Sequence, residues 1–313
     1  MRVDDSIRYV IENVYNNGLD FDVIHTIIEV TGIAINKTPV HIGKGRGELG
    51  EVDNPVMKDN KRRPYIPGSS FKGALRSLAE QLARSSGHYV CDIFSEAKVC
   101  AFRAELLSKL SEASIKGLQD TLDKLIGELN SIARRYKCPS NYVKEIEALL
   151  RNAKDNPKHL EKLLEERPCV VCRVFGNQAL ASHIITYDLN IIGDPRNIVG
   201  TRTRVAIDRF RNASRSGALF DYEYIVPECK WNFKMTLFNI DIVDGTRDVD
   251  LLMKNVLKYI STHGLMLGGM KSVGHGLLIL DSEKTRVKKY IIKDFDIKLE
   301  KEIILSQLVG GKS

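Results

Sequence analysis

Hydrophobic and polar positions alternate in part along "VIHTIIEVTGIAIN" (23–36), which is also rich in β-branched residues. This pattern predicts a strand. An amphipathic segment near residues 5–16 precedes it. The stretch "SSFKGALRSLAEQLARSSG" (69–87) then has helical spacing, with Ser69 or Ser70 as its N-cap. Its buried stripe is formed by Phe71, Leu75, Leu78, Ala79 and Leu82.

Strand patterns return late in the chain, at 182–192, 201–208, 220–226 and 231–243. A helix at 249–263 follows, and then a glycine-rich turn that leads into a strand (264–280). Residues 101–166, dense in Leu, Glu, Lys and Ala, predict helices that interrupt this order. Without them the order is β-α-β-β-α-β, which predicts an α+β, ferredoxin-like core of the kind that RNA-recognition domains also use.

Three parts follow from this pattern. Residues 1–87 hold an N-terminal extension and the first half of the core, and residues 88–172 are the helical insertion. Residues 173–313 hold the second half of the core and a C-terminal tail. Residues 37–64 form a long segment rich in Gly, Lys, Asp and Pro between strand and helix. A connection of that length is usually functional or disordered.

Charge and composition narrow the class of partner. The 313 residues carry a formal charge of +7 with a pI near 9.0, which favours polyanionic partners. No apolar run approaches the ~20 residues that a membrane span needs. The first residues include acidic positions and lack the apolar core of a signal peptide, so we expect a cytoplasmic protein.

Six cysteines are present, and "RPCVVCRVFGN" places Cys169 and Cys172 at the spacing of half a metal site. The candidates for the other two ligands are His88, Cys91 and Cys100, and we expect Cys91 and Cys100, with His88 as the substitute for either. Four such ligands predict a structural Zn²⁺ at the base of the helical insertion. The alternative is a set of unlinked buried thiols, which is how Cys138 and Cys229 are interpreted.

Two glycine-containing segments suit phosphate. In "PYIPGSSFKGALR", free N–H groups at the helix start form an anion site, and Lys72 and Arg76 share one helical face. In "GGMKSVGHG" (268–276), Lys271 and Ser272 stand where a backbone phosphate can approach. The plain alternatives are a well-capped helix with solvated cations and an ordinary loop.

Four motifs in this order resemble the RAMP superfamily of CRISPR-associated RNA-binding proteins: "IPGSSFKGALR", "CRVFGN", "VAIDRFRNASRSGALFDYEYI" and "GGMKSVGHG". The resemblance covers about residues 26–280 and is nearest to the Csm-type backbone subunit of type III effector complexes. It implies a protein of antiviral defence that polymerises head to tail along CRISPR RNA as a helical filament, beside other effector subunits.

The resemblance also implies cleavage of the paired target RNA by an aspartate in the loop after the first strand. The matching stretch "GEVDNPVMKD" makes Asp53 that residue, although from the residues alone Asp59 serves equally well. In the family the neighbouring 2′-hydroxyl attacks the scissile phosphate and a divalent metal such as Mg²⁺ is needed. A carboxylate can orient the hydroxyl, accept its proton or hold the metal.

Basic residues gather in "TRTRVAIDRFRNASRSG" (201–217), which the resemblance makes a projecting β-hairpin, or thumb, that inserts between bases of the guide–target duplex. A solvated basic loop is the alternative. His183, His263 and His275 receive no role. The residues expected to contact RNA are His41, Ser69, Ser70, Lys72, Arg76, Arg204, Arg209, Arg211, Lys271 and Ser272.

Three rival functions remain open at this point. One is an RNA-binding scaffold in which Asp53 has no catalytic part. Another is a stand-alone endoribonuclease that processes CRISPR RNA, for which clustered histidines would be expected. The third is a zinc protein that only binds partners.

Overall fold

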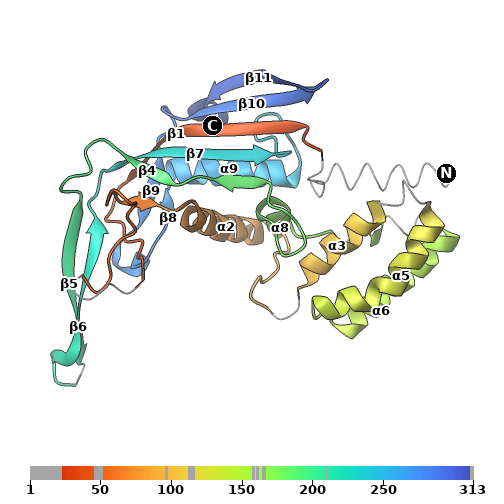
Figure 1. Cartoon of the computed structure of the whole chain (residues 1–313), viewed down its shortest axis with the longest axis horizontal. Coiled ribbons are helices and arrows are strands. Elements are labelled where there is room, and N and C mark those ends of the chain that lie inside the picture. The colour runs from red at the N-terminus through yellow and green to blue at the C-terminus, as the bar shows by residue number, and fades with distance from the viewer. Residues whose placement is uncertain are drawn as a thin grey trace. The chain divides into compact units, whose positions relative to one another are not determined.

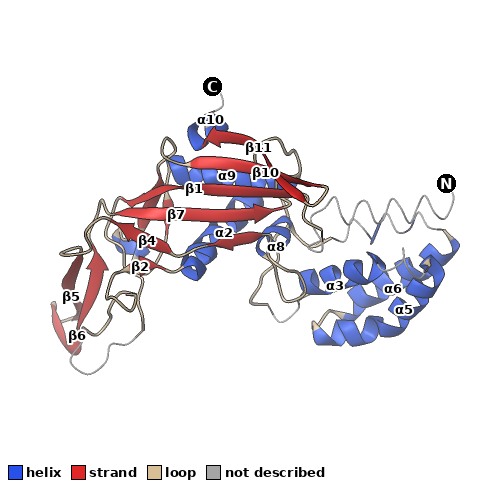
Figure 2. Cartoon of the chain, turned by 45° about the horizontal axis from the view of Figure 1, so that its top comes forward, coloured by secondary structure: helices blue, strands red, loops and turns tan. Residues whose placement is uncertain are grey.

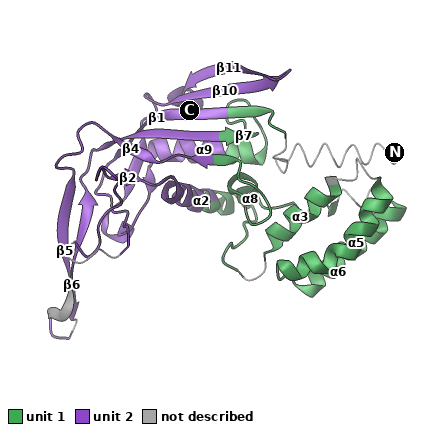
Figure 3. Cartoon of the chain, viewed as in Figure 1, with its two compact units in different colours: residues 1–27, 80–184, 237–252 green, residues 28–79, 185–236, 253–313 purple. Residues whose placement is uncertain are grey.

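The computed structural model describes residues 23–45, 52–95, 98–111, 117–156, 159, 162–163, 167–208 and 210–310, with the side chains of 111 and 213–218 excepted. The amphipathic segment predicted at residues 5–16 lies outside this range. The chain forms two compact units, shown in Figure 3. Unit 1 comprises residues 1–27, 80–184 and 237–252, and unit 2 comprises residues 28–79, 185–236 and 253–313.

A nine-stranded sheet dominates unit 2 (Figure 1). Its main path runs β11-β10-β1-β7-β4-β2, while β9 pairs with β1 and β8, and β3 pairs with β7. Neighbouring strands such as β1 and β9, β4 and β7, and β10 and β11 pair antiparallel. The strands are β1 (Thr26–Asn36), β2 (Tyr65–Ile66), β3 (Ile184–Thr186), β4 (Leu189–Ile192), β7 (Lys230–Phe238), β8 (Leu265–Met266), β9 (Leu277–Leu280), β10 (Arg286–Lys293) and β11 (Asp296–Ile304).

Helices cover one face of this sheet. α2 (Gly68–Ser85) and α9 (Asp248–Thr262) lie behind the strands in Figure 2. Phe71 of α2 meets Phe233 of β7 edge-on, with ring centroids 5.6 Å apart, and both side chains are buried. Burying aromatic side chains this way is a large apolar contribution to folding. The other face is open, because Asn232 of β7 and Asn190 of β4 are exposed.

The predicted α+β class is confirmed as a mixed α/β structure with an antiparallel sheet. The predicted strand at 23–36 and the helix at 249–263 appear as β1 and α9. The finer ferredoxin-like topology and the three predicted parts of the chain stay predictions. α2 begins at Gly68, so Ser69 and Ser70 lie inside its first turn and the N-cap prediction is wrong.

A separate two-stranded ribbon joins β5 (Val199–Asp208) to β6 (Ala213–Ile225). Its register runs from Val199 opposite Ile225 to Asp208 opposite Ala213. Most residues of β5 are exposed, on both faces of the strand. This exposure is expected for a two-stranded ribbon that is separate from the main sheet. The strands predicted at 201–208 and 220–226 are therefore confirmed as one hairpin.

Unit 1 contains the helices that the composition of residues 101–166 predicts, within the range that the structure describes. α3 (Val99–Ser111), α5 (Leu118–Arg135) and α6 (Ser140–Asp155) share a core, and the short α8 (Val170–Phe175) follows. The core includes Phe102, Leu106, Leu122, Leu129, Ile146 and Leu150, each at most 1% exposed. Their helical spacing explains why this segment folds as a small bundle.

The sequence did not predict the elements that follow β9, which are β10, β11 and α10 (Leu305–Val309). Along the described parts of the chain, no helix has the length and apolarity to cross a membrane.

Candidate nucleic-acid interface

The C-terminal end of β6 contacts His41 and Asp53, two of the residues that the sequence singled out. His41 is 8% exposed, and its Nδ1 lies 2.7 Å from the carbonyl oxygen of Glu223. Its ring stands edge-on to Tyr222, with centroids 5.7 Å apart. A hydrogen bond to a carbonyl fixes the tautomer with a proton on Nδ1, so Nε2 is the acceptor when the ring is neutral.

Asp53 lies beside the same strand. Asn54 bridges to Tyr222 in a parallel pairing, and the exposed Asp53 accepts the N–H of Asp221 at its Oδ2 (2.9 Å). Glu223 fixes the loop further: its carboxylate accepts the Val56 N–H and pairs with Lys58 at 2.8 Å. The loop around Asp53 is therefore attached to β6 by main-chain and side-chain bonds.

Asp59 has a different setting. Its Oδ1 accepts the N–H groups of Lys61 and Arg63, and its Oδ2 accepts the Arg63 guanidinium at 2.7 Å. These bonds, led by the Arg63 N–H, hold the pKa of Asp59 below its ordinary value. Asp59 thus closes a turn, whereas one oxygen of Asp53 accepts a single backbone N–H.

Arginines of β5 stack over the tyrosines of β6. The Arg202 guanidinium lies 4.6 Å from the ring centroid of Tyr224, and that of Arg204 lies 5.9 Å from Tyr222. Such cation–π contacts orient the guanidinium groups and leave their edges available to phosphate.

The glycine-rich loop packs against His41. Gly269 donates its N–H to the His41 carbonyl at 2.8 Å, and a Cβ on Gly268 would stand 2.3 Å from the same oxygen. A glycine is therefore needed at 268, where φ is also +77°. Lys271 and Ser272 follow in a short 3₁₀ turn (Lys271–Val273) and are exposed.

The start of α2 differs from the expected anion site. The Gly68 N–H donates to Asp188 Oδ1 at 2.8 Å, so a carboxylate of the protein already occupies one free donor. A Cβ on Gly68 would lie 2.6 Å from the Thr186 carbonyl oxygen, so this glycine admits the neighbouring chain segment. Lys72 and Arg76 are partly buried nearby, where burial and then the Arg76 charge lower the pKa of Lys72.

The tip of the hairpin carries an aromatic residue that sequence reasoning missed. Asp208 Oδ1 accepts the N–H groups of Phe210 and Arg211, which shapes the turn and leaves both side chains exposed. Arg209 lies outside the described residues. An aromatic residue inside the basic run "IDRFRN" is the signal that could have marked Phe210.

Sequence reasoning also missed Tyr222 and gave His275 no role. The Tyr222 hydroxyl lies 3.2 Å from His275 Nε2, and both side chains are buried. Alternating tyrosines in "FDYEYI" were the available signal for Tyr222, whereas His275 lies 53 residues further along the chain and shows no local pattern.

Four cysteines of unit 1 form a cluster: the sulfur atoms of Cys91, Cys100, Cys169 and Cys172 all lie within 4.8 Å of one another. Cys91 Sγ is 3.4 Å from Cys172 Sγ and 3.8 Å from Cys169 Sγ. Tetrahedral zinc with sulfur ligands at ~2.3 Å has sulfurs about 3.8 Å apart, so the donor set and its spacing fit that ion. The exposed His88 is not in this described cluster.

Hydrogen bonds among the four cysteines also shift the pKa values of their thiols. Hydrogen bonds from Cys100 first, then from Cys172 and Cys91, lower the pKa of Cys169, whereas hydrogen bonding with Cys100 is the main cause that raises the pKa of Cys91. The cluster thus stabilises a thiolate, which is the form that binds metal.

Comparison with known proteins places the chain in a family. Its sequence matches the RAMP superfamily over residues 36–279, and the chain belongs to this superfamily. The resemblance drawn from the four motifs is thereby confirmed.

Curated relatives match over shorter segments. The CRISPR system Cms endoribonuclease Csm3 of Methanothermobacter thermautotrophicus is 46% identical over 66 residues, which are 20% of this chain and 27% of the relative. Proteins of the same name from Mycobacterium tuberculosis and Methanocaldococcus jannaschii are 46% and 45% identical over 54 and 60 residues. These segments are 16% and 18% of this chain, and 23% of each relative. The chain spans about a quarter of the length of the curated relatives it matches.

Proposed function

We propose that this chain is a Csm-type backbone subunit of a type III CRISPR complex, acting in the cytoplasm. It binds CRISPR RNA and cleaves complementary target RNA through Asp53. The observation that carries the proposal is the convergence on Asp221–Tyr224 of β6. His41, the Asp53 loop and two stacked arginines of β5 all contact this short stretch.

The relatives support the same function, since the curated proteins that share segments with this chain are named CRISPR endoribonucleases. Phosphate contacts by Arg204, Arg211, Lys72 and Arg76 would bind guide RNA with little base preference. The exposed Phe210 at the hairpin tip is the residue that we expect to enter the base stack.

Cleavage by the neighbouring 2′-hydroxyl makes a bond from O2′ to phosphorus and breaks the bond from phosphorus to O5′. The proton leaves O2′ and a proton is added to O5′, giving a cyclic phosphate and a free 5′-hydroxyl. Asp53 is suited to accept the O2′ proton, because its carboxylate is exposed and is oriented by the N–H of Asp221. A divalent ion such as Mg²⁺, when bound, would supply charge at the phosphate.

The test compares Asp53→Asn and Asp53→Ala with wild type in the assembled complex, on target RNA paired to CRISPR RNA. Asp53→Asn keeps an oxygen that accepts the Asp221 N–H, so it preserves the loop and removes only the charge. We expect cleavage to fall at least about 100-fold in both variants while assembly and RNA binding persist. The same cuts should disappear when EDTA removes divalent metal.

Cuts that persist in Asp53→Asn would return Asp53 to a structural role in its loop. That outcome favours the second candidate, a non-catalytic RNA scaffold. One observation supports it: an oxygen of Asp53 already accepts a backbone N–H of β6.

Two further parts of the proposal concern architecture. The core is ferredoxin-like, which the side-by-side order of β9, β1, β7 and β4 supports. The insertion comprises residues 88–172, and it separates the two halves of the core, residues 1–87 and 173–313. A structural Zn²⁺ is held at the base of the insertion by Cys91, Cys100, Cys169 and Cys172. Copies associate head to tail, which generates a filament.

A further inference from the structure

The open face of the sheet in unit 2 contains a pocket that the cleavage mechanism does not use. It measures about 400 Å³, within the ~300–1,000 Å³ of small-ligand sites. Lys58, Asp59, Asn60, Lys61, Arg63, Tyr65, Asp188 and Asn190 line it. Strands β2 and β4 form its floor, where Tyr65 and Asn190 stand directly opposite each other in the ladder.

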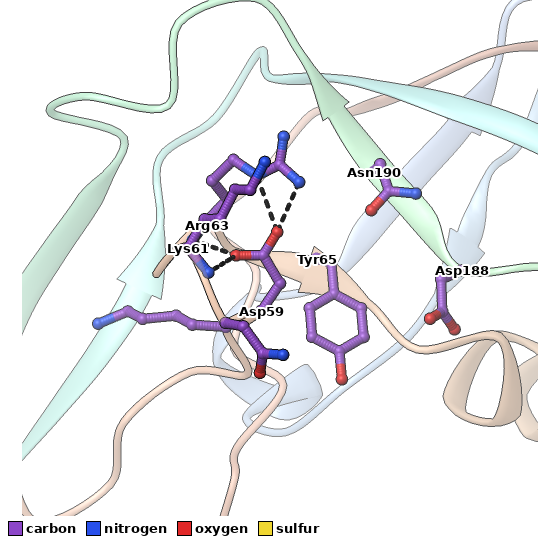
Figure 4. Close-up of a pocket in the computed structure, with 8 residues that line it drawn as sticks. Asp59, Lys61, Arg63, Tyr65, Asp188 and Asn190 are labelled. Atoms are coloured by element: carbon purple, nitrogen blue, oxygen red, sulfur yellow. Dashed lines mark hydrogen bonds and ion pairs between the residues drawn. The ribbon is translucent and has the colours of Figure 1, made fainter.

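Figure 4 shows Tyr65 between two different walls. Asp59, Lys61 and Arg63 lie on one side of the ring, and Asp188 and Asn190 lie on the other. The pocket therefore offers an aromatic ring flanked by a cationic wall and a wall of hydrogen-bonding groups.

The cationic wall suits a phosphate. Arg63 is held by Asp59, and Lys58 is paired with Glu223. Within the described residues the ammonium group of Lys61 has no acidic partner, and its side chain is exposed. Lys58 and Arg63 are each paired with a carboxylate, so Lys61 supplies the positive charge of this wall that a phosphate can meet.

The opposite wall suits the edge of a nucleobase. Asp188 Oδ1 accepts the Gly68 N–H, while its Oδ2 makes no bond to any described residue. The side-chain amide of Asn190 and the hydroxyl of Tyr65 are likewise without a partner in the described part of the chain. A carboxylate oxygen accepts hydrogen bonds only, so it favours a base with two adjacent donors, which is guanine with N1–H and N2–H.

We propose that this pocket binds one unpaired guanosine nucleotide of an RNA strand. The base stacks on Tyr65, its Watson–Crick edge donates to Asp188 and Asn190, and its phosphate lies near Lys61 and Arg63. Single-stranded bases are bound elsewhere by the same combination of aromatic stacking and edge contacts. That the nucleotide belongs to an RNA strand rests on the proposed function, whereas the preference of the pocket for guanosine is tested separately.

The experiment measures the binding of fluorescein-labelled, 12-nucleotide single-stranded RNAs to the full chain by fluorescence anisotropy. It compares an all-uridine RNA with RNAs that carry one central guanosine or one central adenosine. We expect the guanosine RNA to bind about tenfold tighter than the others. Asp188→Asn keeps the oxygen that accepts the Gly68 N–H and replaces Oδ2 by a donor. It should abolish the guanosine preference without weakening binding of all-uridine RNA.

Tyr65 gives a second pair of variants. Tyr65→Ala should weaken the guanosine RNA at least about fivefold, whereas Tyr65→Phe, which keeps the ring, should bind as wild type does. Tyr259→Ala on α9 removes another exposed tyrosine outside the pocket and should change nothing.

Equal affinity of wild type for the three RNAs, with RNA binding intact, would overturn the pocket and leave the proposed function standing. Should no RNA bind, the proposed function fails, and saturation-transfer NMR with GMP and UMP decides the pocket alone. GMP binding that Asp188→Asn removes would support it, and no difference between GMP and UMP would overturn it.

Discussion

His275 shows how residues distant in sequence make one environment. The Tyr222 hydroxyl lies 3.2 Å from its Nε2, although the two residues are 53 positions apart in the chain. Burial lowers the pKa of His275, and the charges of Arg202, Arg204 and His41 lower it further. The folded protein therefore favours the neutral ring.

The pH dependence of stability follows from this depressed pKa. In the unfolded chain the pKa of a histidine is ~6.5, so below this pH the unfolded His275 is protonated while the folded His275 is still neutral. His275 thus favours folding fully above that pH, and its contribution is lost as the pH falls through the lowered folded pKa. We expect the free energy of unfolding to decline between about pH 7.5 and 5.5 in urea titrations, and His275→Asn to flatten the decline. His263→Asn, at an exposed position, is the control, and an equal decline in both variants would contradict the assignment.

At the level of residues, the sequence alone left Asp53 and Asp59 as equals. The structure separates them by contacts that no local pattern encodes, since Asp53 meets Asp221 168 residues away, whereas Asp59 is enclosed by Arg63 of its own turn. Their roles in chemistry stay predictions.

At the level of elements, the glycine-rich segment 268–276 contains, at Gly276, a position where the neighbouring chain leaves no space for a side chain. A Cβ on Gly276 would lie 2.0 Å from the Leu267 carbonyl oxygen, at φ +97°, whereas at Gly274, with φ +84°, it would meet nothing within 4 Å. Gly276→Ala therefore adds a clash to backbone strain, and Gly274→Ala adds strain alone.

We expect Gly274→Ala to cost about 1–2 kcal/mol and Gly276→Ala about 2–5 kcal/mol of stability. Urea unfolding of the two variants measures the difference. Equal losses would mean that the close approach of Leu267 is relieved by a small shift of the chain.

The cysteine cluster makes a second prediction for an element. Purified protein should contain one zinc ion per chain, and Cys91→Ser or Cys172→Ser should lose it and destabilise the helices of unit 1 by about 3 kcal/mol or more. Elemental analysis and thermal unfolding measure both effects. Cys138→Ser, outside the cluster, is the matched control, and full stability of metal-free protein would contradict a structural ion.

Helices and strands with strong periodicity were predictable, whereas the β10–β11 hairpin was not. Its turn is Asp294-Phe295, and both residues have positive φ, 52° and 63°. Such turns usually contain Asn-Gly or Asp-Gly, so the expected signal is absent. The segments "RVKKYIIK" and "DIKLEKEII" are also rich in charge, which hides their alternation.

At the level of the whole molecule, the net charge of +7 should make RNA binding dependent on salt. Each phosphate contact on a single strand contributes ~0.7 to the slope of log affinity against log salt concentration. The double variant Arg202→Gln and Arg204→Gln should therefore lower the slope by about 1.4, measured by anisotropy over a salt series. Lys144→Gln with Arg151→Gln on α6 removes the same charge, and an equal effect there would show a general rather than local attraction.

The superfamily was predictable because four motifs kept their order along the chain, and the match over residues 36–279 confirms it. The segment after residue 279 has no counterpart in that match, and its fold became visible only in the structure.

β11 ends the main path of the sheet, and among the described strands only β10 pairs with it. A free edge of this kind invites strand-to-strand aggregation between molecules, above all in a crowded cell. Lys298, Glu300, Lys301 and Glu302 place charge along the edge, and the register shifts at Lys289 and Tyr290. Charge and an irregular ladder both oppose indiscriminate pairing, so this strand can stay uncovered without causing precipitation.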